Sequence, residues 1–218
     1  MAISKAEFVS ALYSLGVLRV ASLGEAFEYT SGKRGPVYVD CRLIPGNTRV
    51  FHEVLDRLYS QMRDYQVVAL AGVEGGGVPF AVGLATSIRK DYFSVRKNEK
   101  SHGLKMRITG GSVDRRNLIV FEDTVNFGES LMNAVTALRE GGAKVIMCLS
   151  VFAHHPNVLV EMQEKLGIPI TSLVTLGDFK DSFLSAVCAT EQNSAQWREV
   201  EKWQENPVKW SDEYLARK

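Results

Sequence analysis

The stretch Leu118–Ser130 reads LIVFEDTVNFGES and is the most informative part of the chain. Its first four residues form a continuous apolar run, the pattern of a short strand buried on both faces. Glu122 and Asp123 follow this run, and after a short loop containing Gly128 the apolar residues resume at helical spacing. A strand that leads through two acids and a tight turn into a helix predicts acids at the carboxyl edge of an α/β sheet, where such sheets bind ligands.

This arrangement suits a sugar phosphate. Carboxylates accept hydrogen bonds from ribose hydroxyls, and the unpaired N–H groups at the start of the following helix can bind a phosphate. The two acids could equally be capping or loop residues, because acids at strand ends are common. The stretch alone leaves both interpretations open.

The bulk composition predicts one large domain, or one domain with small additions. The 218 residues suffice for a full core, and 45% hydrophobic and 23% charged residues are ordinary for a globular protein. A net charge of +1 does not suggest a nucleic-acid partner. No apolar run approaches the roughly 20 residues that span a bilayer, so no membrane partner is expected. Three scattered cysteines, Cys41, Cys148 and Cys188, favour reduced thiols and a cytoplasmic location over a disulfide scaffold or a zinc site.

Strands and helices alternate through the middle of the chain, which predicts βαβ units. The expected fold class is α/β, with a Rossmann-like, mostly parallel sheet and helices on both faces. A capped helix from Ser4 and extended segments up to residue 43 precede this region. The expected strands are 67–73, 92–95, 118–121, 144–152 and 168–176, and the expected helices include 78–89, 131–139 and 158–166.

The C-terminal stretch 190–218 differs in character from the rest. It is polar, contains all three tryptophans, and is interrupted by Pro207. We expect tail helices that pack on the body or on a second subunit, in preference to a dedicated partner-binding element. The predicted domains are therefore 1–189, which includes an N-terminal substrate segment at 1–46, and the tail 190–218.

Two loops that follow neighbouring strands carry further chemistry. Gly75, Gly76 and Gly77 leave the backbone free of side chains, so its amides can approach a diphosphate, although a plain tight turn explains them as well. Residues 96–105 carry four cations and a histidine but only one acid. Such a run is usually a solvated face, but its length and polarity favour a mobile functional loop. Cations in such a loop could neutralise a leaving diphosphate.

The second loop has a specific spacing. Arg-Lys-x-x-Lys-x-His-Gly at 96–103 resembles the catalytic loop of orotate phosphoribosyltransferases. Segments 30–40, 71–80 and 120–130 resemble, in the same order, that family's substrate segment, diphosphate loop and phosphoribosyl-diphosphate (PRPP) motif. The resemblance extends over roughly residues 4–180.

The resemblance implies a type I phosphoribosyltransferase fold with an N-terminal hood-like segment. It implies an enzyme of pyrimidine nucleotide synthesis that transfers ribose 5-phosphate from PRPP to orotate and releases diphosphate. The implied cofactor is Mg²⁺, held mainly by ligand oxygens and waters and by no dedicated protein ligands. The implied assembly is a homodimer in which the mobile loop of one subunit reaches the active site of the other.

The roles implied by the resemblance fall into three groups. The catalytic residues would be Lys100, Asp123 and His102. Tyr38 and Lys33 would contact the base. PRPP and its diphosphate would be bound by Arg96, Lys97, Lys100, His102, Glu74, Gly75, Gly76, Glu122, Asp123, Asn126, Gly128 and Ser130.

The chain departs from the family pattern in two places. Asn126, Phe127 and Glu129 stand where the family has a threonine and small residues, and Glu129 would repel a phosphate unless it points to solvent. His154 and His155 follow the strand at which the family has an arginine for orotate. Two alternatives to the enzyme therefore stay open: a non-catalytic regulator or scaffold that binds a nucleotide or PRPP, and a phosphoribosyltransferase for another base.

Overall fold

The computed structural model describes residues 3–29, 32–96, 107–186 and 190–217. The chain forms two compact units. The terminal unit comprises residues 1–44 and 176–218, and the sheet unit comprises residues 45–175. The division predicted from sequence, at residue 189, stays a prediction, as does the hood-like role of the N-terminal segment.

The terminal unit combines the two ends of the chain. Ser4 begins α1 (Lys5–Ser14) with the expected capping box, in which its side chain and that of Glu7 each accept a backbone N–H of the other. Two short antiparallel pairs follow: β1 (Leu18–Val20) with β4 (Val37–Val39), and β2 (Phe27–Glu28) with β3 (Arg34–Gly35). The remaining helices are η1 (Cys41–Gly46, which crosses into the sheet unit), η2 (Leu176–Phe179), α6 (Lys180–Ala186), α7 (Glu191–Glu205) and α8 (Pro207–Ala216).

The C-terminal stretch forms helices, as expected, and both belong to the terminal unit. Trp197, Val200 and Trp203 share the buried face of α7. Helix α8 is attached to β3, because the buried Ser211 hydroxyl accepts the backbone N–H of Arg34 at 2.9 Å. The tail therefore holds the segment in which the base-contacting residues were expected.

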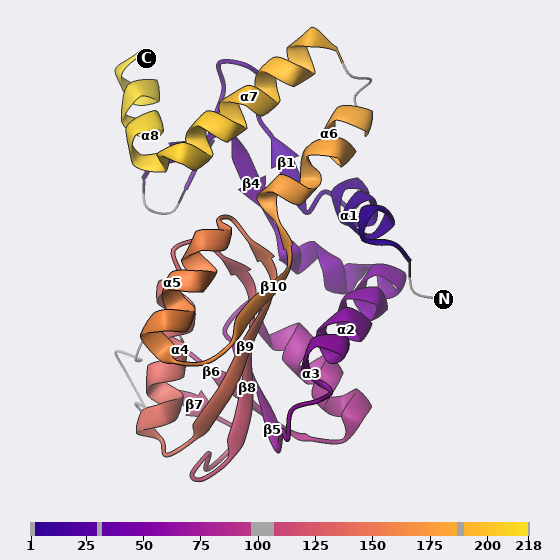
Figure 1. The fold of residues 1–218 in the computed structure, drawn as a ribbon, viewed down its shortest axis with the longest axis vertical. Helices are drawn as coiled ribbons and strands as arrows, with labels where there is room; N and C mark the ends of the chain where they lie inside the picture. The colour runs from indigo at the N-terminus through magenta and orange to yellow at the C-terminus, as the bar shows by residue number, and fades with distance from the viewer. Residues whose placement is uncertain (1–2, 30–31, 97–106, 187–189, 218) are drawn as a thin grey trace. The chain divides into compact units, whose positions relative to one another are not determined.

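The sheet unit has a six-stranded sheet in the order β10-β9-β8-β5-β6-β7. All neighbouring pairs are parallel except β6 and β7. Helices α2 and α3 cover one face, and α4 and α5 cover the other (Figure 1). The predicted α/β fold class is confirmed. The bounds are α2 (Thr48–Met62), β5 (Ala69–Val73), α3 (Val78–Ile88), β6 (Asp91–Val95), β7 (Ile108–Thr109), β8 (Asn117–Val125), α4 (Glu129–Glu140), β9 (Lys144–Ala153), α5 (Pro156–Leu166) and β10 (Ile170–Thr175).

The strand order reverses between β5 and β8. From β5 the chain passes through α3 to β6 on one side, and it then returns to build β8, β9 and β10 on the other side. The loops that follow β5 and β8 consequently lead to helices on opposite faces of the sheet, α3 and α4, and we call the space outside the carboxyl ends of these two strands the crevice. In open α/β sheets this switch point is the usual ligand site.

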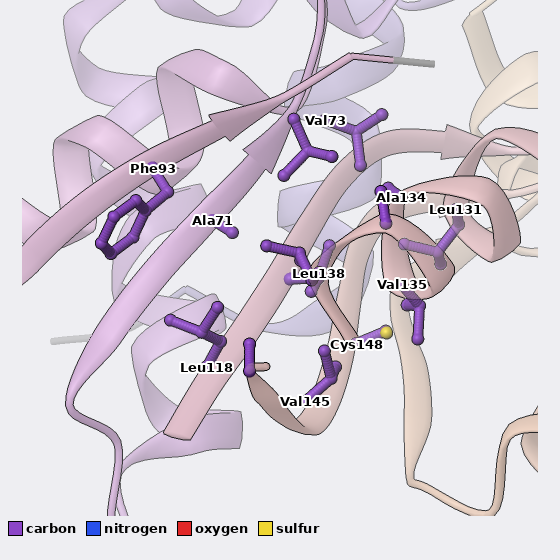
Figure 2. Close-up of a cluster of buried hydrophobic side chains, with 14 of the residues drawn as sticks. Ala71, Val73, Phe93, Leu118, Leu131, Ala134, Val135, Leu138, Val145 and Cys148 are labelled. Atoms are coloured by element: carbon purple, nitrogen blue, oxygen red, sulfur yellow. The ribbon is translucent and has the colours of Figure 1, made fainter. Parts of the chain in front are cut away.

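A continuous apolar core holds α4 on the sheet. Figure 2 shows Leu131, Ala134, Val135 and Leu138 of α4 beside residues of β5, β6, β8 and β9. These four side chains recur at the three- and four-residue spacing of one helical face, which explains why the segment forms a helix against the sheet. Burial of a Leu or Val side chain stabilises the fold by roughly 1.5–3 kcal/mol. The start of α4 is therefore held firmly at the switch point.

Within the sheet unit, two strands differ most from the sequence prediction. The central strand was expected to end at Phe121, but β8 continues to Val125 and contains both acids, because its ladder with β9 extends to the pair Val125–Ala153. The short strand β7, at the sheet edge, was not expected. Nowhere in the described part of the chain is there a helix long and apolar enough to cross a bilayer.

Candidate active site

The turn Glu74–Gly77, which follows β5 and is called the glycine turn below, packs directly on β8. A Cβ atom at Gly76 would lie 2.0 Å from Cγ of Asp123, and one at Gly77 would lie 2.2 Å from the carbonyl oxygen of Phe121. A side chain at Gly77 would collide with the backbone of β8, and one at Gly76 would displace the Asp123 carboxyl, so this close approach favours glycine at both positions. The turn therefore lies against one of the two acids. Gly76 and Gly77 are buried in this contact, whereas Gly75 is exposed and a Cβ there would meet nothing within 4 Å. The expected contact of this backbone with a diphosphate stays a prediction.

The two acids point to opposite faces of the sheet. Glu122 lies two residues after Val120, which packs in the α4 core, and it pairs across the ladder with Ser150. Its side chain is buried, at 2% exposure, and its Oε1 accepts the backbone N–H of Asp123 at 3.2 Å. Asp123 lies on the other face, against the Gly76 turn, and is partly exposed. Asp123 is thus the acid that a ligand in the crevice reaches more readily.

The loop from Asn126 to Gly128 leads into α4. Gly128 precedes the helix with a φ of 82°, a left-handed conformation that suits glycine, and it has no side chain to cap the first N–H groups. Oδ1 of Asn126 is buried and accepts no hydrogen bond within the described residues. Ser130, in the first turn, is partly buried. Free N–H groups at a helix start can bind an anion.

The two unusual residues of this loop face outward. Phe127 is 62% exposed, and Glu129 is also exposed. Both line a groove of about 470 Å³ formed with Met162 and Lys165, among other residues of α4 and α5. The Glu129 side chain therefore lies on the solvent side of the helix.

Arg96 lies beside the glycine turn. Its Nε is 3.2 Å from Oε2 of Glu74, and Oε1 of Glu74 also accepts the Ser94 hydroxyl at 3.5 Å. The pairing of β5 with β6 brings these residues together, and the backbone N–H of Glu74 donates to Val95. Glu74, Gly75, Gly76 and Arg96 thus lie close together, and their predicted roles in binding PRPP stay predictions. Lys97, Lys100 and His102 lie outside the described residues.

Two histidines follow β9 at the same edge of the sheet. The backbone N–H of His154 donates to Val125 at 2.9 Å, so the first histidine extends the ladder and is not an exposed loop residue. Burial, together with the adjacent His155, lowers the pKa of His154 to about 3. Burial also lowers the pKa of the half-buried His155. At neutral pH His154 therefore carries no positive charge for an anionic base.

The residues predicted to contact the base lie in the terminal unit. The Tyr38 ring packs against Phe27, with centroids 5.7 Å apart, and the Arg19 guanidinium lies 4.9 Å from the Tyr38 ring centroid. Nζ of Lys33 contacts Oδ1 of Asp212 in α8 at 2.7 Å. Both roles stay predictions.

Sequence reasoning passed over two residues that the structure connects to this region. Ser150 pairs with Glu122, and its buried hydroxyl has no hydrogen-bond partner within the described residues. The sequence does single out Ser150, because it is the one residue with a hydroxyl in the apolar run 145–153. Arg107 lies just beyond the cation-rich loop 96–105, and its side chain donates to the backbone carbonyl of Asn133 in α4.

This fold and site define a class of protein. The family model described as "Phosphoribosyl transferase domain" matches residues 47–170, more than half of the chain. The orotate phosphoribosyltransferase of Staphylothermus marinus is 31% identical over 158 residues, 72% of this chain and 76% of that protein. The chain therefore belongs to the phosphoribosyltransferase family, in its orotate phosphoribosyltransferase branch.

Solved structures agree with this assignment. The orotate phosphoribosyltransferase of Aeropyrum pernix is 26% identical, with a TM-score of 0.69, and the match covers 80% of this chain and 97% of that one. The Mycobacterium tuberculosis enzyme, crystallised in complex with PRPP, is 25% identical, with a TM-score of 0.62 and the same coverage of 80% and 97%.

Proposed function

We propose that this chain is an orotate phosphoribosyltransferase that transfers ribose 5-phosphate from PRPP to orotate and releases diphosphate. The observation that carries the proposal is the packing of the Glu74–Gly77 turn on Asp123 at the switch point of the sheet. In support, the glycine turn, the carboxylate of Asp123 and the loop that leads into α4 all lie at the carboxyl ends of the neighbouring strands β5 and β8. The PRPP complex of the related M. tuberculosis enzyme supports the same substrate here.

The geometry suggests how each part of PRPP is bound. The ribose hydroxyls donate to Asp123, the more accessible acid, and the 5′-phosphate accepts N–H groups at the start of α4. The diphosphate lies along the glycine turn, near Arg96. Glu122 supports this arrangement from the other face by accepting the backbone N–H of Asp123.

The reaction exchanges one bond at the anomeric carbon of the ribose. The bond to the diphosphate oxygen breaks, the diphosphate leaves with the electron pair, and a nitrogen of orotate forms the new bond and loses its proton. Negative charge builds up on the leaving diphosphate, so cations fixed beside it stabilise the transition state. Arg96 and the predicted cations Lys97 and Lys100 have this role in the proposal.

Mg²⁺ forms part of the proposal, and the chemistry of the residues fits it. Mg²⁺ prefers oxygen ligands and usually keeps waters and phosphate oxygens around it, with one or two carboxylates. Asp123 offers such a carboxylate at the crevice and would hold the ion together with oxygens of PRPP. When bound, the ion would supply positive charge to the diphosphate.

The assembly and the cellular location also belong to the proposal. The resemblance of segment 96–103 to the family's loop supports a homodimer with a shared loop. The three cysteines, Cys41, Cys148 and Cys188, are scattered along the chain with no paired spacing, which supports a reducing compartment, and we propose the cytoplasm.

One observation favours a second candidate, transfer to a base other than orotate. The neutral His154 stands where the resembled family has an arginine for orotate. The test is product analysis after incubation with PRPP, Mg²⁺ and either orotate or uracil at equal concentration. Orotidine 5′-phosphate as the main product supports the first candidate. Uridine 5′-phosphate as the main product would establish the second.

A further inference from the structure

Arg96 and Arg107 meet in the sheet unit, although ten residues separate them in sequence. Strands β6 and β7 pair antiparallel through Ser94–Thr109 and Val95–Ile108. The backbone N–H of Arg96 extends this pairing by donating to the carbonyl of Arg107 at 2.9 Å. Both residues therefore lie at the end of one short ladder, near the edge of the sheet.

The side chain of Arg107 fastens this ladder to a helix. Its Nη2 lies 3.1 Å from the carbonyl oxygen of Asn133, in the second turn of α4, and 3.4 Å from that of Arg96. A guanidinium group suits such bridging because its several N–H donors have a fixed geometry. Arg107 thus joins the backbone at the end of β6 to the helix whose start faces the crevice.

Arg96 connects this ladder to the glycine turn. The Arg96 side chain reaches Glu74 in the glycine turn, with Nε 3.2 Å from Oε2. A short two-stranded edge ladder holds its last residues weakly, so the position of Arg96 depends on what fixes its backbone. Two hydrogen bonds to Arg107 do so. The Arg96 N–H donates to the backbone carbonyl of Arg107, and the Arg96 carbonyl accepts Nη2 of Arg107, the one of the two bonds that the Arg107 side chain makes.

We propose that Arg107 is a positioning residue, which holds Arg96 against the glycine turn so that the Arg96 guanidinium meets the diphosphate of PRPP. The proposal rests on the proposed function only in taking a diphosphate as the group that Arg96 meets. Arg107 acts through the Arg96 backbone and through α4.

The test compares Arg107→Met with a matched control on the same helix. Arg139→Met also removes a guanidinium that donates to a backbone carbonyl, that of Leu166 at 2.8 Å, but in the last turn of α4. We expect Arg107→Met to weaken binding of inorganic diphosphate with Mg²⁺ by tenfold or more and to raise the KM for PRPP. Arg139→Met should change the diphosphate affinity and the KM for PRPP by no more than twofold. Arg107→Lys, which keeps a donor, should bind diphosphate more tightly than Arg107→Met. Equal affinity in Arg107→Met and the wild type would overturn the proposal.

A double-mutant cycle separates positioning from a general loss of stability. If Arg107 acts through Arg96, the double variant Arg96→Met/Arg107→Met should bind diphosphate no more weakly than Arg96→Met alone. If the losses of diphosphate affinity caused by the two single substitutions add up in the double variant, Arg107 acts independently of Arg96, and the proposal is wrong. Because the readout is diphosphate binding, failure to transfer ribose phosphate to orotate would count against the proposed function and leave this result standing.

Discussion

At the scale of single residues, the contact between the glycine turn and β8 is the most demanding feature of the site. Sequence analysis predicted a bare backbone at Gly75–Gly77 but could not distinguish a ligand cradle from a plain turn. The approach of Gly76 to Asp123 could not be predicted either, because it depends on the pairing of β5 with β8, which no local pattern records. The consequences of the departures at Glu129 and His154 likewise could not be predicted, because they depend on whether each side chain is exposed or buried.

Gly76→Ala is expected to displace the Asp123 carboxyl, since the added Cβ would lie 2.0 Å from its Cγ. A displacement of about 1 Å in an active site costs on the order of a hundredfold in rate, so kcat/KM for PRPP should fall by about that factor. Gly177→Ala is the control, because a Cβ there meets nothing within 4 Å. Steady-state kinetics check both variants, and unchanged kinetics in Gly76→Ala would contradict the described packing.

His154 gives the fold a defined sensitivity to acid. Its pKa falls from 6.5 to about 3 on folding, so its neutral form stabilises the folded state fully above pH 6.5, and this contribution is lost as the pH falls from 6.5 toward 3. Between pH 7.5 and 5.5 the wild type should lose about 1 kcal/mol more unfolding free energy than His154→Gln. Urea unfolding at the two pH values measures this difference. Parallel losses in both proteins would show that His154 is not responsible.

At the scale of elements, the apolar periodicity predicted the main strands and helices of the sheet unit but not all their ends. The predicted end of the central strand, at Phe121, was wrong. The last residues of β8, Glu122–Val125, form no apolar run but are held by hydrogen bonds to β9. The strand β7 was missed because two residues at an edge leave no periodicity to detect. Hydrogen-bonded pairing across the sheet, which no local pattern records, determines both features.

The start of α4 allows a test of the phosphate loop. Because Glu129 is exposed in the groove with Lys165, its carboxylate should not compete with a phosphate for the N–H groups of the helix. Glu129→Thr should therefore leave the Kd for PRPP, measured by calorimetry, within about twofold, while loss of an acid from the first turn costs only about 0.3–1 kcal/mol of stability. Tenfold tighter binding would instead place the carboxylate in the phosphate site.

At the scale of the whole molecule, the fold class followed from the alternation of strands and helices, and the family followed from four segments spread along the chain. The grouping of residues 1–44 with 176–218 could not be predicted in this way. It depends on contacts such as Ser211 with Arg34, between residues far apart in sequence. The role of this terminal unit in binding the base stays a prediction.

The proposed dimer with a shared loop predicts complementation between two inactive variants. Lys100→Ala and Asp123→Asn would each abolish turnover, but a mixed dimer would contain one site with both residues intact. Equal amounts of the two variants, unfolded and refolded together, should regain roughly a quarter of the wild-type activity. Random assembly makes about half of the dimers mixed, and one of the two sites in each mixed dimer is intact. Activity no higher than the sum of the two separate variants would exclude a shared site.

The most direct test of the proposed function is calorimetric titration with PRPP and Mg²⁺, repeated with orotate present while the absorbance of orotate is followed. We expect micromolar binding of PRPP and a loss of orotate absorbance that requires both PRPP and Mg²⁺. The Gly76→Ala variant should bind PRPP more weakly under the same conditions. If the wild type binds no PRPP, the crevice at the switch point is not a phosphoribosyltransferase site, and the central proposal is wrong.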